Sequence, residues 1–416
     1  MYIKRVIEEK LSFLRNQYAC LVIYGPRQVG KSTLIRHVFQ DFNFVTLDDV
    51  DDLMLARNNP KLFLDTYPSP LIIDEIQKAS NLLSELKKRI DEKKNEWMEE
   101  GNSHQLLYVL TGSNQFELQN GISESLAGRV VVLELNSFSI TEKNGWNAKP
   151  FSPLISELQE KERNMQSHYL SKDVLFEEIF RGGMPELFTQ KLLRDDYFKS
   201  YINTYLEKDI RLLVSESSVI TFRNFLSYVA LRTAQELHYD EIASSVGIDV
   251  KTTKRWISIL QMTGVIQILY PFMANQSNRI IKAPKLYFMD TGLCAYLCGW
   301  PNAEMLSKCA MAGAFFETYV TSEIIKNFQA YNLDYRNELF YYRDIDGKEI
   351  DLLYVKDQRI YPIEIKKGVN PVKPTKNFDV LRKYNLPIEK GLVIDCTDRI
   401  RPINDKAYMI PVGLIG

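Results

Sequence analysis

The stretch best suited to chemistry is a glycine-flanked loop with the pattern Gly-x4-Gly-Lys-Ser at residues 25–33. The apolar run 21–24 precedes it and the run 34–39 follows it, so the local order is strand, loop, helix. In that order the glycines let successive backbone N–H groups point at phosphate oxygens, and the helix N-terminus adds positive potential. The pattern predicts a nucleotide-binding phosphate loop, against the alternative of a chance glycine turn.

Individual loop positions have distinct expected roles. We expect Lys31 to neutralise the β and γ phosphates, Ser32 to hold Mg²⁺, and Thr33 to begin the helix. The residues predicted to bind ATP are Gly25, Pro26, Arg27, Gln28, Val29, Gly30, Lys31, Ser32 and Thr33.

A second apolar run, 70–73, ends in the paired carboxylates Asp74 and Glu75. In an ATPase the first carboxylate of such a pair orients Mg²⁺ through its water shell, and the second polarises the attacking water. Asp74 is therefore the predicted metal residue and Glu75 the predicted general base. The alternative is an ordinary strand end followed by a helix.

Two further segments carry candidate phosphate contacts. The run 105–110 predicts a strand that ends at a polar tetrapeptide, where Ser113 or Asn114 is placed to sense a γ phosphate. Arg129 precedes the predicted strand 130–135, and an arginine there can reach a γ phosphate of its own subunit or of a neighbour. A surface salt bridge is an equally weighted alternative for Arg129.

The length and composition of the chain indicate its number of domains and its class of protein. A chain of 416 residues should form two or more domains, and 45% hydrophobic with 25% charged residues is an ordinary soluble composition. The net charge of −1 excludes a globally basic nucleic-acid-binding protein but leaves room for local basic patches.

The cysteines and the N-terminus indicate a compartment. None of the five cysteines forms a Cys-x-x-Cys pair, and the four histidines are scattered, so a structural zinc site is not expected. The N-terminus lacks the apolar core of a signal peptide, and no run reaches the roughly 18 apolar residues of a membrane helix. These features predict a cytoplasmic protein with free thiols and no membrane contact.

A helix-turn-helix pattern begins at Phe222. Asp249 is placed to cap a helix over 250–262, whose exposed face would carry Lys251, Thr252, Lys254 and Arg255. The strand-like run 265–270, with a return near 279–282, would supply a wing. Such a module either contacts DNA or serves only in packing, and we weigh the two equally.

The C-terminal part contains a predicted hairpin, 349–355 and 360–366, in which Asp351 would lie opposite Glu364. Two facing carboxylates repel unless a cation or a shared proton intervenes, and Lys366 projects from the same face. With Glu317 on a preceding helix, this layout predicts a site for Mg²⁺ or Mn²⁺ that cleaves phosphodiesters. The alternative is an exposed hairpin with ordinary ion pairs, and Pro362 suggests an edge strand or a bulge.

Several of these segments together resemble a widespread prokaryotic family of AAA-type ATPases with a C-terminal domain similar to restriction endonucleases. The matching stretches are 25–33, 73–77, 111–113, 125–129, 181–186, 205–210 and 284–293. The resemblance implies an α/β fold with four parts: a P-loop ATPase core of parallel strands at 1–138, a helical lid at 139–215, a winged helix-turn-helix at 216–283, and a restriction-endonuclease-like α/β domain at 284–416. Arg181 is then either a sensor contact or part of a glycine turn.

Three functional hypotheses follow. The first is an ATP-hydrolysing machine that acts on DNA, with catalytic groups Lys31, Glu75 and Arg129 and a nuclease site of Glu317, Asp351, Glu364 and Lys366. The second is an ATP-driven molecular switch whose C-terminal domains dock protein partners. A small-molecule kinase is a poor third, and a homo-oligomer is compatible with each.

Overall fold

The computed structural model describes residues 2–101, 105–113, 126–164, 169–206, 219–273, 283–369 and 371–416. The chain divides into two compact units, the first made of residues 1–138 with 262–264 and 329–332, the second of 139–261, 265–328 and 333–416. Within residues 139–416 the subdivision at 215 and 283 remains a prediction.

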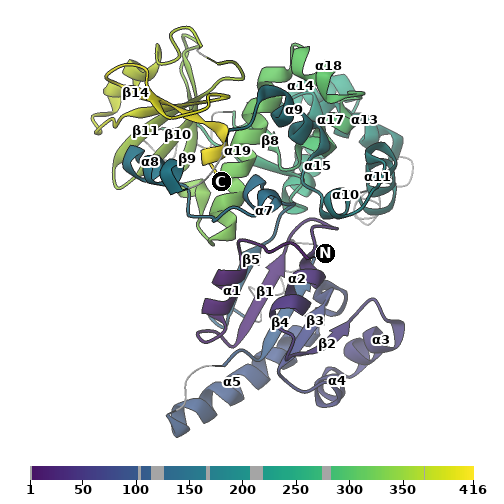
Figure 1. The fold of residues 1–416 in the computed structure, drawn as a ribbon. Helices are drawn as coiled ribbons and strands as arrows, with labels where there is room; N and C mark the ends of the chain where they lie inside the picture. Colours follow the sequence, from purple (N-terminus) through teal and green to yellow (C-terminus); the bar gives the residue numbers. More distant parts are fainter. Residues whose placement is uncertain are drawn as a thin grey trace. The chain divides into compact units, whose positions relative to one another are not determined.

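The first unit is built on a parallel sheet with the strand order β2-β3-β4-β1-β5 (Figure 1). Its strands are β1 (Cys20–Tyr24), β2 (Asn43–Thr46), β3 (Leu71–Asp74), β4 (Tyr108–Gly112) and β5 (Val130–Glu134). Its helices are α1 (Glu8–Leu14), α2 (Lys31–Val38), α3 (Val50–Asn58), α4 (Pro60–Thr66), η1 (Ile76–Ala79) and α5 (Leu82–Glu100).

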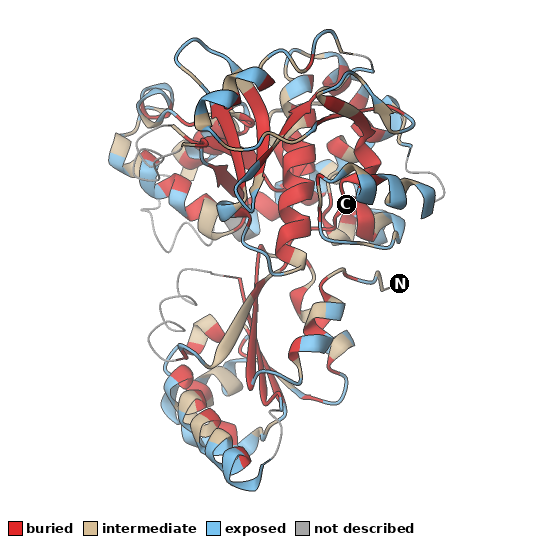
Figure 2. Ribbon diagram, turned by 90° about the vertical axis from the view of Figure 1, so that its left-hand side faces the viewer, coloured by how far each residue is buried: buried red, intermediate tan, exposed pale blue. Residues whose placement is uncertain are grey.

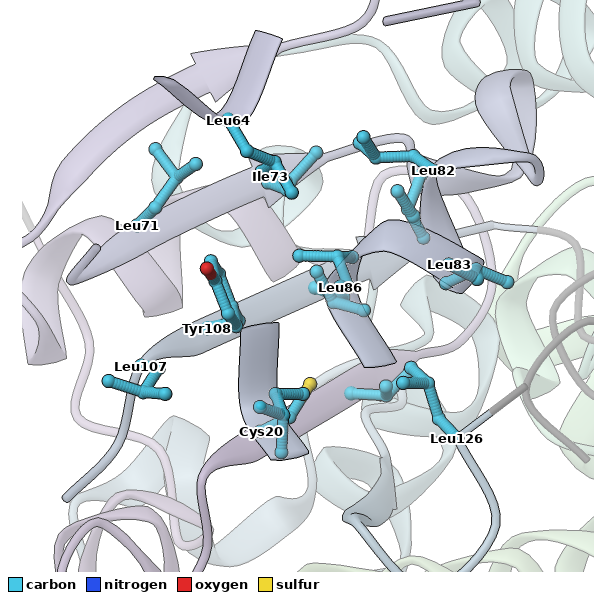
Figure 3. Packing of buried hydrophobic residues seen from close by; sticks show 14 of the residues in the cluster. Cys20, Leu64, Leu71, Ile73, Leu82, Leu83, Leu86, Leu107, Tyr108 and Leu126 are labelled. Carbon is cyan, nitrogen blue, oxygen red and sulfur yellow. The ribbon is translucent and has the colours of Figure 1, made fainter. Parts of the chain in front are cut away.

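Burial explains why these runs became strands. Every residue of β1, β3 and β4 is buried, as expected for parallel strands covered on both faces. Apolar side chains from the sheet and from the buried face of α5 pack into one cluster, part of which Figure 3 shows. Because the strands are parallel, the residues that follow β1, β3 and β4 come out at one edge of the sheet.

The second unit begins with helices and continues into a small antiparallel sheet. The helices are α7 (Ile140–Asn144), α8 (Ile155–Asn164), α9 (Lys172–Arg181), α10 (Pro185–Thr189), α11 (Arg194–Tyr201), η2 (Ile202–Leu206), α13 (Val219–Ala230), α14 (Tyr239–Val246), α15 (Val250–Met262), α17 (Thr291–Leu297) and α18 (Ala303–Lys308). The sheet has the order β6-β8-β7, from β6 (Gln235–Glu236), β7 (Ile266–Leu269) and β8 (Lys285–Phe288).

The C-terminal part of this unit is a mixed sheet with the order β13-β14-β12-β11-β10-β9 beside the long helix α19. Its elements are α19 (Ala312–Ala330), η4 (Tyr335–Asn337), β9 (Leu339–Arg343), β10 (Glu349–Lys356), β11 (Arg359–Ile365), η5 (Phe378–Tyr384), β12 (Gly391–Asp395), β13 (Arg401–Pro402), β14 (Ala407–Pro411) and η6 (Val412–Leu414). Figure 2 shows that the strands of both large sheets are mostly buried.

The hairpin of β10 and β11 has the predicted register, with Val355 opposite Ile360. The prediction that Pro362 marks an edge or a bulge is wrong, because β11 lies between β10 and β12. Pro362 comes directly before Ile363, which makes the first pair with β12. The missing N–H therefore falls just outside that ladder.

Some sequence-based expectations lie outside the described residues. These are Asn114, the wing return at 279–282 and residues 207–210. Among the helices that the structure describes, none is both long and apolar enough to cross a membrane.

Candidate functional site

The phosphate loop connects β1 to α2 at the carboxyl edge of the first sheet. Gly30 has a φ of +89° and α2 begins at Lys31, two residues earlier than predicted. A Cβ on Gly25 would lie 2.0 Å from the carbonyl oxygen of Leu135, so no larger residue fits there without moving the backbone. Lys31 Nζ donates to the carbonyls of Gly25 (3.0 Å) and Pro26 (2.8 Å), which holds its ammonium over the loop.

Asp74 is connected to the loop by its side chain. Ser32 Oγ donates to Asp74 Oδ2 at 2.8 Å, and Thr111 Oγ1 donates to Asp74 Oδ1. Asp74 ends β3, Thr111 lies in β4 and Ser32 follows β1 in the first turn of α2. Because β1, β4 and β3 are parallel, the three residues meet at one edge of the sheet. Carboxylate and hydroxyl oxygens are hard ligands that suit Mg²⁺, so this pair fits the metal that the sequence predicts.

Glu75 follows Asp74 in a left-handed backbone conformation, with φ of +58°. Its carboxylate oxygen Oε2 accepts hydrogen bonds from the amide of Gln77 and, at 3.4 Å, from Ser113 Oγ. Non-glycine residues in this conformation are uncommon and concentrate at functional sites. Because Glu75 directly follows Asp74 and bonds to Ser113 after β4, its carboxylate lies at the same sheet edge as Asp74.

Arg129 lies at the amino ends of the strands, whereas the phosphate loop lies at their carboxyl ends. Val130, the next residue, pairs with Cys20 at the start of β1, whereas the loop leaves β1 after Tyr24, about 16 Å further along at the usual rise per strand residue. The guanidinium pairs with Asp91 of α5 through bonds of 2.6 and 2.9 Å, and this partner lowers the pKa of Asp91. Contact of Arg129 with a γ phosphate of its own chain does not fit this position. A contact with a neighbour's nucleotide stays a prediction.

The C-terminal carboxylates Asp351 and Glu364 are both buried, and Lys366 lies between them. Lys366 Nζ is 3.1 Å from Asp351 Oδ2 and 2.6 Å from Glu364 Oε1. Burial, and then the charge of Asp351, raise the pKa of Glu364 to about 7. Burial disfavours the ammonium of Lys366, but the two carboxylates outweigh it and raise its pKa.

Asp351 does not continue the hairpin ladder, which ends at Leu352 opposite Ile363. The register of β10 against β9 shifts between Ile350 and Leu353, which is a β-bulge. Asp351 Oδ2 instead accepts the backbone N–H of Ile365 at 2.8 Å. Bulges of this kind re-aim a side chain, here towards Lys366.

The carboxylate of Glu317 pairs with residues of β8, whereas Asp351 and Glu364 pair with Lys366. Its Oε1 accepts from Lys285 Nζ and from the hydroxyl of Tyr287, both at 2.8 Å. Lys285, only 2% exposed in its side chain, also pairs with Glu349 at 2.5 Å. Burial, opposed in part by Lys285, raises the pKa of Glu317 to about 7.

The preformed metal group expected from Glu317, Asp351 and Glu364 is therefore not assembled. Among the residues the structure describes, no three His, Cys, Asp or Glu side chains are arranged to hold a metal ion. The reason is that Lys285 and Tyr287 bind the first carboxylate while Lys366 binds the other two. Glu364 Oε2, however, is buried without a hydrogen-bond partner, as a group that accepts a cation would be.

Sequence reasoning missed Thr111, Gln77 and Lys285 as parts of these sites. Thr111 and Gln77 were in segments already expected at the sheet edge, so a search for hydroxyl and amide partners of Asp74 and Glu75 could have found them. Lys285 makes contacts 32 residues or more along the chain, for which no local pattern gives a signal.

Comparison with known proteins agrees with the loop and sheet. Residues 17–144 match the model of an AAA domain. This part of the chain is therefore similar to AAA domains. Residues 172–304 and 312–415 match two domains of unknown function, DUF8612 and DUF4143.

Relatives over most of the chain are uncharacterized. Rv2008c of Mycobacterium tuberculosis and Mb2031c of Mycobacterium bovis are each 28% identical over 400 residues, which is 95% of this chain and 80% of theirs. Among solved structures, a Walker-type ATPase of Pyrococcus abyssi is 15% identical with a TM-score of 0.38, covering 70% of this chain and 94% of its own. The Holliday junction branch migration motor RuvB of Thermotoga maritima is 14% identical with a TM-score of 0.31, covering 63% and 88%.

Substitution of the buried lysine tests the C-terminal ion cluster. Lys285→Met would leave the buried Glu317 without its ammonium, while Glu349 keeps its pair with Arg343 at 3.5 Å, so we expect a loss of about 3–5 kcal/mol in the free energy of unfolding. Urea unfolding followed by circular dichroism measures it. The control is Lys308→Met, which removes the exposed pair with Glu304 and should cost about 0–1 kcal/mol. Equal losses for the two variants would contradict the buried network.

Proposed function

We propose that the first unit binds ATP with Mg²⁺ and hydrolyses it. The observation that carries this proposal is the direct bond between Ser32 of the loop and Asp74, with Glu75 next in the chain. Mg²⁺, when bound, neutralises the charge of the phosphates. Ser32 and Asp74 would hold it, as their oxygen donors allow.

The remaining residues have roles that follow from their positions. The loop N–H groups and Lys31 bind phosphate oxygens, and the peptide dipoles of α2 add positive potential, which no acidic residue in its first turn offsets. Glu75 takes the proton of the attacking water, and Gln77 with Ser113 orients its carboxylate. A Lys31 ammonium that now bonds to two carbonyls turns to the phosphates when the nucleotide binds.

Glu75→Gln is the direct test of this assignment. We expect ATP turnover to fall about 10²–10⁴-fold, because the amide cannot accept the proton of water, while ATP affinity stays within a few-fold of wild type. Phosphate release measures turnover and calorimetric titration measures affinity. The matched control is Glu99→Gln, an exposed residue of α5 that should change neither quantity. Full turnover in Glu75→Gln would remove this residue as the base.

We further propose that residues 284–416 form a restriction-endonuclease-like domain that cleaves phosphodiesters with Mg²⁺ or Mn²⁺. Support comes from Asp351, Glu364 and Lys366 lying together in the buried cluster. The unpartnered Oε2 of Glu364 gives a cation an oxygen to bind. Asp351 and Glu364 are the groups that would hold it, and the metal would supply an activated water.

Cleavage assays test this second site. Linear and circular DNA are incubated with Mn²⁺, with and without ATP, and Asp351→Ala should lose about 10² of the cleavage rate or more because it removes a metal ligand. Asp357→Ala, at the exposed turn of the same hairpin, is the control. Absence of cleavage alongside normal ATP turnover would favour the molecular switch, with these domains docking proteins.

DNA contact is proposed for the face of α15 that carries Lys251, Lys254 and Arg255, all exposed. The order α13, β6, α14, α15, β7, β8 with the sheet β6-β8-β7 supports a winged helix-turn-helix. Asp249 caps α15 as expected, through a bond from the N–H of Thr252 at 2.9 Å. Thr252, which the sequence placed on the exposed face, is half-buried.

Salt dependence measures this contact. Each phosphate contact contributes about −0.9 to the slope of log affinity against log salt, so Lys254→Ala with Arg255→Ala should reduce the slope by about 2. Fluorescence anisotropy with a labelled duplex gives both slopes. Lys308→Ala, which removes an exposed charge on α18, should leave the slope unchanged. A double variant with the wild-type slope would exclude this face of α15.

A further inference from the structure

Arg5, near the N-terminus, contacts a backbone carbonyl of the phosphate loop in the first unit. The residue is only 4% exposed although it precedes α1 in a short N-terminal segment. Its Nη1 donates to the carbonyl oxygen of Val29 at 2.9 Å, and its Nη2 donates to that of Asn136 at 2.6 Å. The guanidinium also lies 4.8 Å from the centre of the Phe138 ring. Arg5 thus joins the loop to the segment that follows β5.

The bond to Val29 fixes one peptide plane of the loop. The carbonyl of Val29 and the N–H of Gly30 belong to the same peptide group and point in opposite directions when the bond is trans. Because Arg5 holds the carbonyl on its own side, the N–H of Gly30 is directed away from Arg5. That N–H is one of the donors that a phosphate loop aims at its ligand.

The other end of the loop is held by the same segment. A Cβ on Gly25 would collide with the carbonyl of Leu135, which shows how closely the loop begins against the residues after β5. Arg5 bonds to Asn136, the next residue. The segment after β5 therefore contacts the start of the loop directly and its end through Arg5.

Arg5 is itself positioned by its neighbours. Glu8 Oε1 accepts the backbone N–H of Arg5 at 2.6 Å and the hydroxyl of Tyr2 at 2.8 Å. The Tyr2 ring stacks on His37 of α2, with centroids 3.7 Å apart and planes 25° apart. The N-terminal segment thus contacts the helix that begins at Lys31 as well as the loop that precedes it.

We propose that Arg5 is a positioning residue that holds the phosphate loop in its nucleotide-binding conformation. The proposal rests on the proposed ATP binding of this loop. A guanidinium is required because two carbonyls at different places are bonded by different nitrogens of one rigid fork, which the single ammonium of lysine cannot reproduce. Its charge also adds positive potential beside Gly30, because a Cβ added at Gly30 would lie 3.9 Å from Arg5 Nη1.

Calorimetric titration of the full chain with MgATP and MgADP tests the proposal, using wild type, Arg5→Ala, Arg5→Lys and Lys4→Ala. Lys4 is the adjacent exposed cation, with a side chain 70% exposed. We expect Arg5→Ala to weaken the affinity for both nucleotides about ten-fold or more. The variant loses the charge-assisted hydrogen bonds that join the loop to the segment after β5. The affinity of Arg5→Lys should lie between those of wild type and Arg5→Ala, and the affinity of Lys4→Ala should match that of wild type. Titrations well below each variant's melting temperature separate loop geometry from loss of stability.

The outcomes are distinct. A folded Arg5→Ala that binds both nucleotides like Lys4→Ala overturns the proposal. If Arg5→Ala does not fold, Arg5→Lys decides, and unchanged affinity in that variant overturns it. If wild type binds ATP without hydrolysing it, the proposed hydrolysis fails while Arg5 is still judged by affinity. If wild type binds neither nucleotide, both proposals fall.

Discussion

The first unit depends on the parallel alignment of β1, β4 and β3. Because these strands run in one direction, the loop after β1, the hydroxyl of Thr111 and the carboxylate of Asp74 leave the sheet at the same edge. The buried carboxylate then receives a hydrogen bond from Ser32 on one side and from Thr111 on the other. A slip of either strand by one residue would reverse the facing of its side chains and remove the site.

Most of this unit could be predicted because its signals are local. A fully buried apolar run, a glycine loop and a following helix lie within 20 residues, and the run before Asp74 has the same character. Sequence could not give the position of Arg129 or Arg5. Arg129 depends on which edge of the sheet its strand starts from, and the contacts of Arg5 span 24 and 131 residues.

The C-terminal site was predicted in part for the same reason. A two-residue turn sets the hairpin register, so Val355 opposite Ile360 followed from the sequence. The bulge before Leu353 depends on β9, and the capture of Glu317 depends on β8. The pattern of β10 alone does not show where its pairing with β9 shifts, and Lys285 of β8 lies 32 residues from Glu317, too far for a local periodicity to reveal the contact.

The ammonium of Lys366 would compete with any other cation for the carboxylates of Asp351 and Glu364. Its ammonium is covalently attached beside Asp351 and Glu364, so it is present at a high effective concentration, in the way a tethered ligand is. Any cation that enters between these carboxylates has to displace a charge that cannot diffuse away. The electrostatic attraction of a doubly charged ion to two carboxylates exceeds that of the ammonium it displaces. The attraction of a singly charged ion does not. At the proposed metal site, the tethered lysine would thereby favour divalent over monovalent ions.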